Sequence, residues 1–182
     1  SADKTELGRN FANKIWNATR FAMMNLGDTP LAPWSADLPA SLGLPDRWIL
    51  SRLQTAIADV RAAVDAYRLN DATTTLYRFI WGELCDWYLE LVKGVLYGDD
   101  EEAKGNVRRT LVTALDRALR LLHPFMPFIT EEIWHALPIR RPTESIMIAP
   151  YPQANEAWRD ADAEGIAERM IDRRLRVLRP TP

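Results

Sequence analysis

Apolar residues near the start of the chain recur at the spacing of an α-helix. At about 100° per residue, five of them form one stripe: Leu7, Phe11, Ile15, Ala18 and Ala22. The opposite face is polar, and no acidic residue occurs between Leu7 and Leu26. The pattern predicts an amphipathic helix that packs its apolar stripe on a core and ends at Gly27-Asp28.

The same period predicts five more helices. Capping residues and glycine or proline breaks place them at 46–67, 71–98, 105–122, 130–137 and 156–179. Asp46 is the expected N-cap of the first of these, and Asn70 or Asp71 that of the next. The 71–98 pattern is apolar around much of its circumference, which indicates the central, most buried helix.

Two connections complete the picture. Residues 27–45 carry four prolines and read as a long ordered connection, with Trp34 and Leu38 as its anchors to the core. Residues 145–149 read as a brief extended piece. The predicted fold is therefore all-α: a bundle of about five helices over 1–152, with a helical appendage over 153–182.

Composition narrows the class of protein. The chain has 182 residues, of which 47% are hydrophobic, and seven are tryptophan, so we expect a globular domain with a sizeable core. The net charge of −2 excludes a generically basic nucleic-acid binder, so any RNA contact must come from a local patch. A single cysteine, Cys85, excludes a disulfide framework. Without an apolar run of membrane-spanning length, we expect a soluble, cytoplasmic protein.

The polar face of the first helix is unusual for a merely solvated surface. Asparagine weakens helices because its amide competes for backbone hydrogen bonds. Here three asparagines share the face with cations and a ring: Arg9, Asn10, Asn13, Lys14, Asn17, Arg20 and Phe21. An aromatic ring framed by amides and cations suits unpaired bases. Alternatively, Phe21 packs under a neighbouring loop that the asparagines tie down.

No constellation elsewhere indicates catalysis or a metal site. His123 and His135 lack zinc-ligand spacing, and Cys85 reads as a buried, inert thiol. The acidic pairs at 99–102 and 131–132 open helices, where the helix dipole accounts for them. Asp86 lies in an aromatic run and reads as a buried structural carboxylate that needs an Arg or Trp donor.

Three stretches resemble one protein family. Residues 8–21 (GRNFANKIWNATRF) closely resemble the first helix of the anticodon-binding domain of valyl-tRNA synthetases. Residues 84–90 (LCDWYLE) resemble a second stretch of that family. Residues 123–134 (HPFMPFITEEIW) resemble a third, which the isoleucyl and leucyl enzymes share. The resemblance covers most of residues 1–152 in order.

The resemblance implies that the anticodon stem-loop of valine tRNA docks on the first helix. Carried over by position, Lys14, Arg20 and Phe21 are the main candidates. Phe21 would stack on an unpaired base, worth about 1–3 kcal/mol. Asn10, Asn13 and Asn17 would read base edges or position loops, and Arg9 is a further candidate.

The resemblance also implies what the chain lacks. The family activates its amino acid on a Rossmann domain with HIGH-type and KMSKS-type signatures, and neither string occurs here. We therefore expect a chain that is inactive alone and binds no cofactor, while the parent enzyme uses ATP, magnesium and valine. The expected partners are tRNA and the catalytic domain of the same polypeptide, in a monomer.

Alternatives remain open. The same domain of an isoleucyl or leucyl enzyme would keep the binding mode and change the anticodon. A helical protein-interaction module without an RNA partner is the distant alternative. The last predicted helix carries five arginines that would contact the tRNA backbone or form a solvated face with Glu164, Glu168 and Asp172: Arg169, Arg173, Arg174, Arg176 and Arg179.

Overall fold

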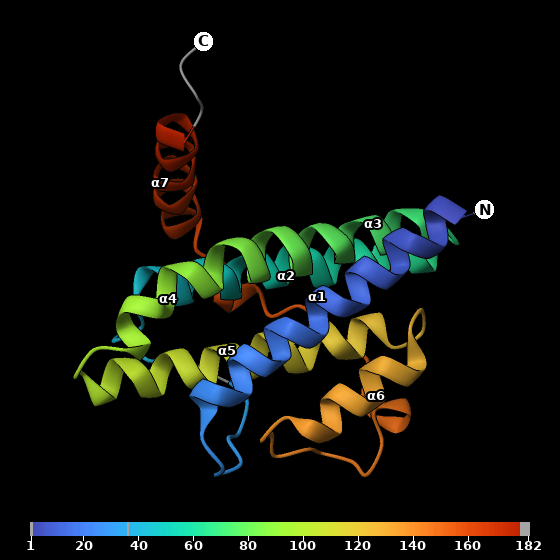
Figure 1. Cartoon of the computed structure of the whole chain (residues 1–182), viewed down its shortest axis with the longest axis horizontal. Helices are drawn as coiled ribbons and strands as arrows, with labels where there is room; N and C mark the ends of the chain where they lie inside the picture. The colour runs from blue at the N-terminus through green and yellow to red at the C-terminus, as the bar shows by residue number, and fades with distance from the viewer. Residues whose placement is uncertain (1, 36, 179–182) are drawn as a thin grey trace.

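The computed structural model describes residues 2–35 and 37–178, with the side chains of 8–35 and 37–176 (Figure 1). Two residues named in the predictions, Leu7 and Arg179, therefore have side chains that lie outside the described part of the structure. Over this range the chain is helical, and its extended pairing is one isolated bridge, Leu31 with Ile139. The all-α prediction is confirmed. The main helices are α1 Ala2–Leu26, α2 Leu44–Asp65, α3 Leu69–Tyr77, α4 Leu89–Leu96, α5 Glu101–Leu122, α6 Pro127–Ala136 and α7 Ala161–Leu178.

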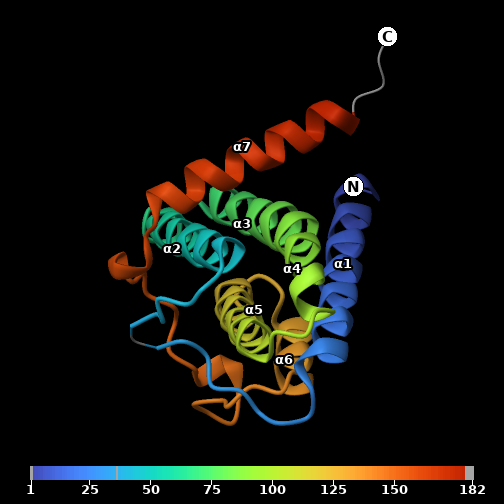
Figure 2. The same ribbon diagram turned by 90° about the vertical axis from the view of Figure 1, so that its left-hand side faces the viewer.

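The helix α5 runs through the middle of the bundle, not the predicted 71–98 helix. Helix α3, residues 78–88 and α4 follow one another without a break and form one long helical rod, the α3–α4 rod. Seen end-on, α5 is surrounded by this rod, α1, α2 and α6 (Figure 2). Twelve of the 22 residues of α5 are buried, among them Leu111, Val112 and Leu121. In the α3–α4 rod, Trp81 and Trp87 are only half-buried. Some apolar residues of the rod therefore line a hollow beside α1 instead of packing in the core.

Helix ends follow local chemistry, and two predicted caps are wrong. Gly27, at φ +72°, takes the left-handed conformation that ends α1 as predicted. Helix α2 starts two residues early, with Gly43 as N-cap, because Pro45 suits the first turn. Asp46 is instead buried inside that turn, where Tyr88 Oη donates to its carboxylate at 2.7 Å. Arg68, not Asn70 or Asp71, is the N-cap of α3.

The predicted 71–98 helix is interrupted by a π-helix. Between α3 and α4 lies η1, Arg78–Tyr88, an eleven-residue stretch with the wider π-type turn. Such stretches are rare and concentrate at functional sites. The stretch η1 packs against α1, so its wider turn faces the helix that carries the candidate RNA surface.

The later elements differ from prediction mainly at their boundaries. The α6 helix begins at Pro127, three residues before Thr130. Residues 145–149 are extended at the two ends and form a 3₁₀ turn, η2 Ile146–Ile148, between them. The predicted 156–179 helix is a 3₁₀ turn, η3 Glu156–Trp158, followed by α7.

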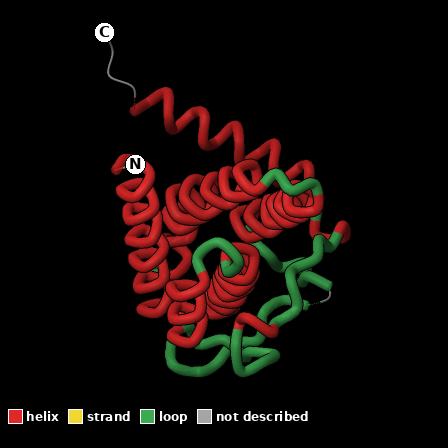
Figure 3. Tube along the Cα trace, turned by 90° about the vertical axis from the view of Figure 1, so that its right-hand side faces the viewer, coloured by secondary structure: helices red, strands yellow, loops and turns green. Residues whose placement is uncertain are grey.

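The long loops lie together along one side of the bundle (Figure 3). The 27–43 connection is held there by two backbone bonds, from Leu31 N to Pro138 O (2.8 Å) and from Arg140 N to Leu31 O (2.9 Å). Trp34 is buried and donates its indole N–H to Thr110 at 3.2 Å, so its predicted anchoring role is confirmed. The opposite side, with α1 and the α3–α4 rod, is left free of long loops.

The appendage helix α7 starts on α2 and extends away from the bundle (Figures 1 and 2). Arg52 of α2 binds Glu83 of η1 at 3.0 Å and Glu164 of α7 at 3.2 Å, which ties three elements together. None of the described helices has the length and apolar character needed to cross a membrane.

Candidate nucleic-acid interface

The polar strip of α1 faces outward, as its sequence predicts. Phe11, Ile15 and Ala18 are buried and fix the orientation of the helix. Five of the seven predicted site residues are exposed on the other side: Arg9, Asn10, Asn13, Asn17 and Arg20. Within the described part of the chain, Arg20 makes no ion pair. Its guanidinium is free to meet a phosphate or a base edge.

Lys14 lies at the seam between this strip and η1, and its ammonium is already engaged. Its Nζ forms an ion pair with the carboxylate of Asp86 and lies 3.8 Å from the centroid of the Trp81 ring. The Lys14 side chain is 21% exposed and that of Asp86 49%. Lys14 was expected to be an isolated cation, but its ammonium contacts both the Asp86 carboxylate and the Trp81 indole. Asp86 is half-exposed, which corrects its interpretation as a buried structural acid, and its donor is a lysine.

Phe21 lies at the same seam, one turn beyond Asn17. Its ring is half-buried against the edge of the core and leaves part of its surface open. The Nζ of Lys93, on α4, lies 5.8 Å from the ring centroid and forms an ion pair with Glu90. Phe21 therefore packs beside a second helix, α4, and not under a loop as the alternative prediction had it.

A hollow of about 220 Å³ connects these groups. Three predicted residues, Lys14, Asn17 and Phe21, line one wall. The other wall comes from the α3–α4 rod and includes Cys85, Leu89, Glu90 and Lys93. The structure thus brings Lys14, Asn17 and Phe21 together and leaves Arg9, Asn10, Asn13 and Arg20 on the open strip.

Sequence reasoning missed the contribution of the rod. Lys93 and Trp81 were not singled out, although both stand in an aromatic-rich stretch that continues the LCDWYLE motif. An aromatic ladder backs the seam: Phe11 lies 5.1 Å from Tyr77, and Tyr77 stacks on Trp81 at 5.3 Å. The signal that could have found Trp81 is its i, i+4 spacing from Tyr77, whereas Lys93 has no comparable signal in the sequence.

Cys85 is no nucleophile. Burial raises the pKa of its thiol to about 12, an effect that the nearby Lys14 opposes and Asp86 reinforces. At neutral pH the group is a thiol, as the sequence predicted. It serves as a half-buried apolar lining of the hollow.

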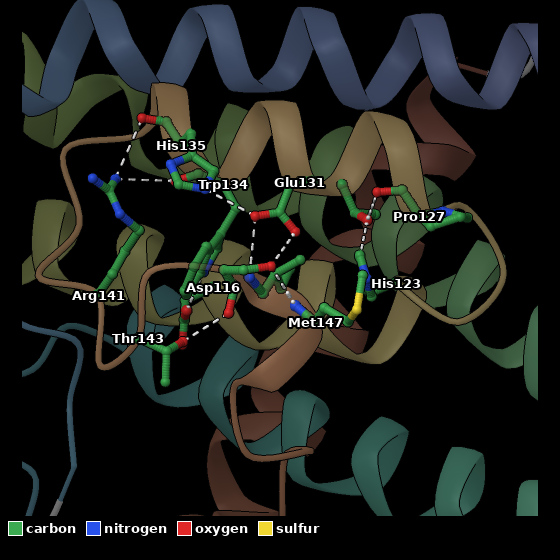
Figure 4. Close-up of polar contacts among 12 residues, drawn as sticks. Asp116, His123, Pro127, Glu131, Trp134, His135, Arg141, Thr143 and Met147 are labelled. Carbon is green, nitrogen blue, oxygen red and sulfur yellow. Dashed lines mark hydrogen bonds and ion pairs between the residues drawn. The ribbon is translucent and has the colours of Figure 1, made fainter.

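The two histidines and Glu131 make structural polar contacts around α6, away from this hollow (Figure 4). His123 Nδ1 lies 2.8 Å from Thr130 Oγ1, which joins the end of α5 to α6. Glu131 accepts from Ser145 Oγ at 3.0 Å and from Ile146 N at 3.2 Å, and lies 2.8 Å from His135 Nε2. These hydrogen bonds lower the pKa of Glu131 against the opposing effect of burial. Across the described residues, no three such side chains are placed to hold a metal ion.

The arginines of α7 form a largely solvated surface. Arg169, Arg173 and Arg174 are exposed, and Arg176 binds Asp172 one turn away at 2.5 Å. Glu164 binds Arg52 of α2 and so leaves the predicted intrahelical set. Arg179 lies outside the described residues.

Comparisons with known proteins identify the family of the chain. A family model described as the anticodon-binding domain of tRNA ligase matches residues 46–179. Relatives include the valine–tRNA ligase of Geobacter sulfurreducens, 57% identical over 80% of this chain and 16% of that protein. Another is the valine–tRNA ligase of Latilactobacillus sakei, 49% identical over 94% of this chain and 19% of that protein. The chain spans about a fifth of the length of these relatives.

A solved structure shares the fold. It is that of agnB2 LeuRS from Agrobacterium radiobacter K84, in a ternary complex with tRNA and LeuAMS. The TM-score is 0.61 at 23% identity, over 86% of this chain and 17% of that one.

Proposed function

Because the chain belongs to the family of anticodon-binding domains of tRNA ligases, we propose that it binds the anticodon loop of valine tRNA on α1. The observation that carries the proposal is the outward strip of α1. It combines exposed amides and cations, carries no acidic residue between Gly8 and Leu26, and borders a half-buried ring. The relatives support the valine specificity, since they are valine–tRNA ligases.

The strip and the hollow supply the three interactions that a single-stranded RNA loop needs. The open surface of Phe21 offers a stacking platform for one unpaired base, and Asn13 and Asn17 have amides that can pair with base edges. Arg9 and Arg20 are exposed cations that can bind phosphates, which produces a salt-dependent affinity.

The proposal extends to the parent protein. A valine–tRNA ligase would attach valine to the tRNA at the expense of ATP, with magnesium, using parts of the polypeptide beyond this chain. This chain would hold the anticodon end and bind none of those cofactors. We place it in a monomeric enzyme in the cytoplasm, joined to its catalytic domain.

Binding of labelled anticodon stem-loops to the 182-residue chain tests the proposal. Fluorescence anisotropy over a salt series should show tighter binding of the valine stem-loop than of the isoleucine stem-loop, weakening as salt rises. Equal affinities would overturn the valine specificity. The absence of any salt-sensitive association would overturn RNA binding and favour a protein-interaction module.

Arg20→Ala tests the location of the site. We expect the salt slope for the valine stem-loop to flatten by about one unit for the lost phosphate contact. Arg174→Ala, which removes another exposed arginine from α7, is the matched control and should leave the slope unchanged. A response to Arg174→Ala alone would move the interface to α7.

A further inference from the structure

We propose that Asp86 is a positioning residue of the RNA interface, one that sets how strongly the site prefers a fitting loop over any other polyanion. The inference rests on the proposed function of α1 and deepens it. Asp86 acts through Lys14: its carboxylate holds the ammonium over the Trp81 ring and shields it from phosphates that arrive in the wrong place.

The geometry places Asp86 across the interface rather than along one helix. Lys14 comes from α1 and Asp86 from the π-helix η1, 72 positions later in the chain. The Lys14 Nζ has two partners, the Asp86 carboxylate and the Trp81 face, in two directions. A free lysine samples many rotamers, so this double contact fixes the ammonium at the rim of the hollow before any RNA arrives.

The exposure of the pair argues against a role in stability. Half of the Asp86 side chain is open to solvent, and exposed ion pairs contribute about 0–1 kcal/mol. A carboxylate is also an unexpected choice beside a surface for polyanions, since it repels phosphate. Its presence is explained if repulsion is useful.

A second set at the same seam repeats the arrangement. Lys93 pairs with Glu90 and lies 5.8 Å from the Phe21 ring, so each lysine near the hollow has both a carboxylate and an aromatic face. A stray phosphate must compete with these carboxylates for the ammonium groups. A loop that stacks on Phe21 and pairs with the amides of α1 gains contacts that do not depend on that competition. Specificity here comes from what is repelled as well as from what is bound.

Asp86→Asn tests the inference, because the amide keeps the shape and removes the charge. The probes are the valine stem-loop and the same stem with a scrambled loop, each titrated over a salt series. We expect the scrambled loop to bind several-fold more tightly, with a salt slope steeper by about 0.7 as Lys14 gains a phosphate. The valine loop should gain nothing, so that the preference falls about fivefold or more.

Two further variants make the result specific. Asp86→Glu restores the charge and should restore the preference. Asp71→Asn removes another exposed acid, paired with Arg68 at 3.2 Å, and should change neither affinity nor slope. A fall in melting temperature with an unchanged preference would make Asp86 structural and overturn the inference.

The outcomes separate this inference from the proposed function. If the wild-type chain prefers the valine loop and Asp86→Asn keeps that preference, the role of Asp86 is wrong and the function of α1 stands. If the wild-type chain shows no preference, the proposed function fails first and the inference fails with it.

Discussion

An aspartate, a cation and a tryptophan meet at two places in this molecule, with opposite consequences. On α5, Asp116 is 1% exposed and accepts from Trp134 Nε1 at 2.7 Å (Figure 4). It also accepts from Arg120 Nη2 at 2.7 Å. Between α1 and η1, Asp86 is half-exposed, and its lysine lies over the face of Trp81 instead of its edge. The first set joins α5 to α6, and the second borders an open hollow.

The comparison shows that desolvation, more than residue type, decides what such a set does. Inside the bundle, water cannot replace a missing partner, so every donor to Asp116 contributes to folding. At the seam, water can replace either partner of the ion pair at little cost in stability. A ligand can therefore compete with Asp86 for the ammonium of Lys14. Four variants sharpen this contrast.

Asp116→Ala should have the largest effect, a loss of about 3–5 kcal/mol in the free energy of unfolding. The substitution leaves the buried Trp134 indole N–H without its acceptor and removes the carboxylate partner of the Arg120 guanidinium, which keeps only the Pro150 carbonyl. Urea denaturation followed by circular dichroism measures the loss. A loss below 1 kcal/mol would show that water reaches this site and would remove the contrast with Asp86.

Asp46→Asn should come next, and its effect depends on pH. Burial raises the pKa of Asp46 from 3.8 to about 6, against the hydrogen bond from Tyr88. The folded state therefore holds the proton more tightly, and the stability this contributes is full below pH 3.8 and lost as pH rises through 6. Relative to Asp46→Asn, the wild type should lose about 3 kcal/mol over this window, at about 1.4 kcal/mol per unit.

The difference between wild type and Asp46→Asn is the quantity to measure, because other acids titrate in both proteins. Denaturation curves at pH 4, 5, 6 and 7 provide it. The Asn oxygen can still accept from Tyr88, so the difference isolates the charge. A difference that does not vary with pH would mean that Asp46 is solvated like Asp86.

A pair of tryptophan substitutions compares the two sets directly. Trp134→Phe removes the donor to Asp116 in a fully buried site and should cost about 1–3 kcal/mol. Trp81→Phe keeps an aromatic face for Lys14 in a half-buried site and should cost about 1 kcal/mol or less. Melting curves of the two variants, recorded together, test the order. The reverse order would make Trp81 the structural residue.

The bundle could be predicted from the sequence because its helices are strongly periodic. The stripe of Phe11, Ile15 and Ala18 is buried as predicted, and α1 ends at its glycine. Caps were less predictable, because Asp46 has the chemistry of an N-cap and its burial against Tyr88 is decided by a helix 42 positions away. The π-helix has no signature in the hydrophobic pattern.

The candidate site likewise has one part that the sequence predicts and one part that it does not. Exposure of Asn13, Asn17 and Arg20 follows from the period of one helix. The engagement of Lys14 with Asp86 depends on how α1 packs against η1, a pairing of residues 72 positions apart that no single-helix pattern contains. Which lysine is paired and which arginine is free is therefore a property of tertiary structure.

The smallest effect is expected where the sequence was least informative, at Lys14 and Asp86. A double-mutant cycle of Lys14→Met and Asp86→Asn should give a coupling free energy of about 0–1 kcal/mol in low salt. In 1 M salt, where the Debye length is about 3 Å, it should fall toward zero. A matching cycle of Asp116→Asn and Arg120→Met should keep its larger coupling in 1 M salt, since that pair is shielded from ions. If the Lys14–Asp86 coupling were large and insensitive to salt, the seam would be closed to solvent ions, and a phosphate would have no access to the lysine.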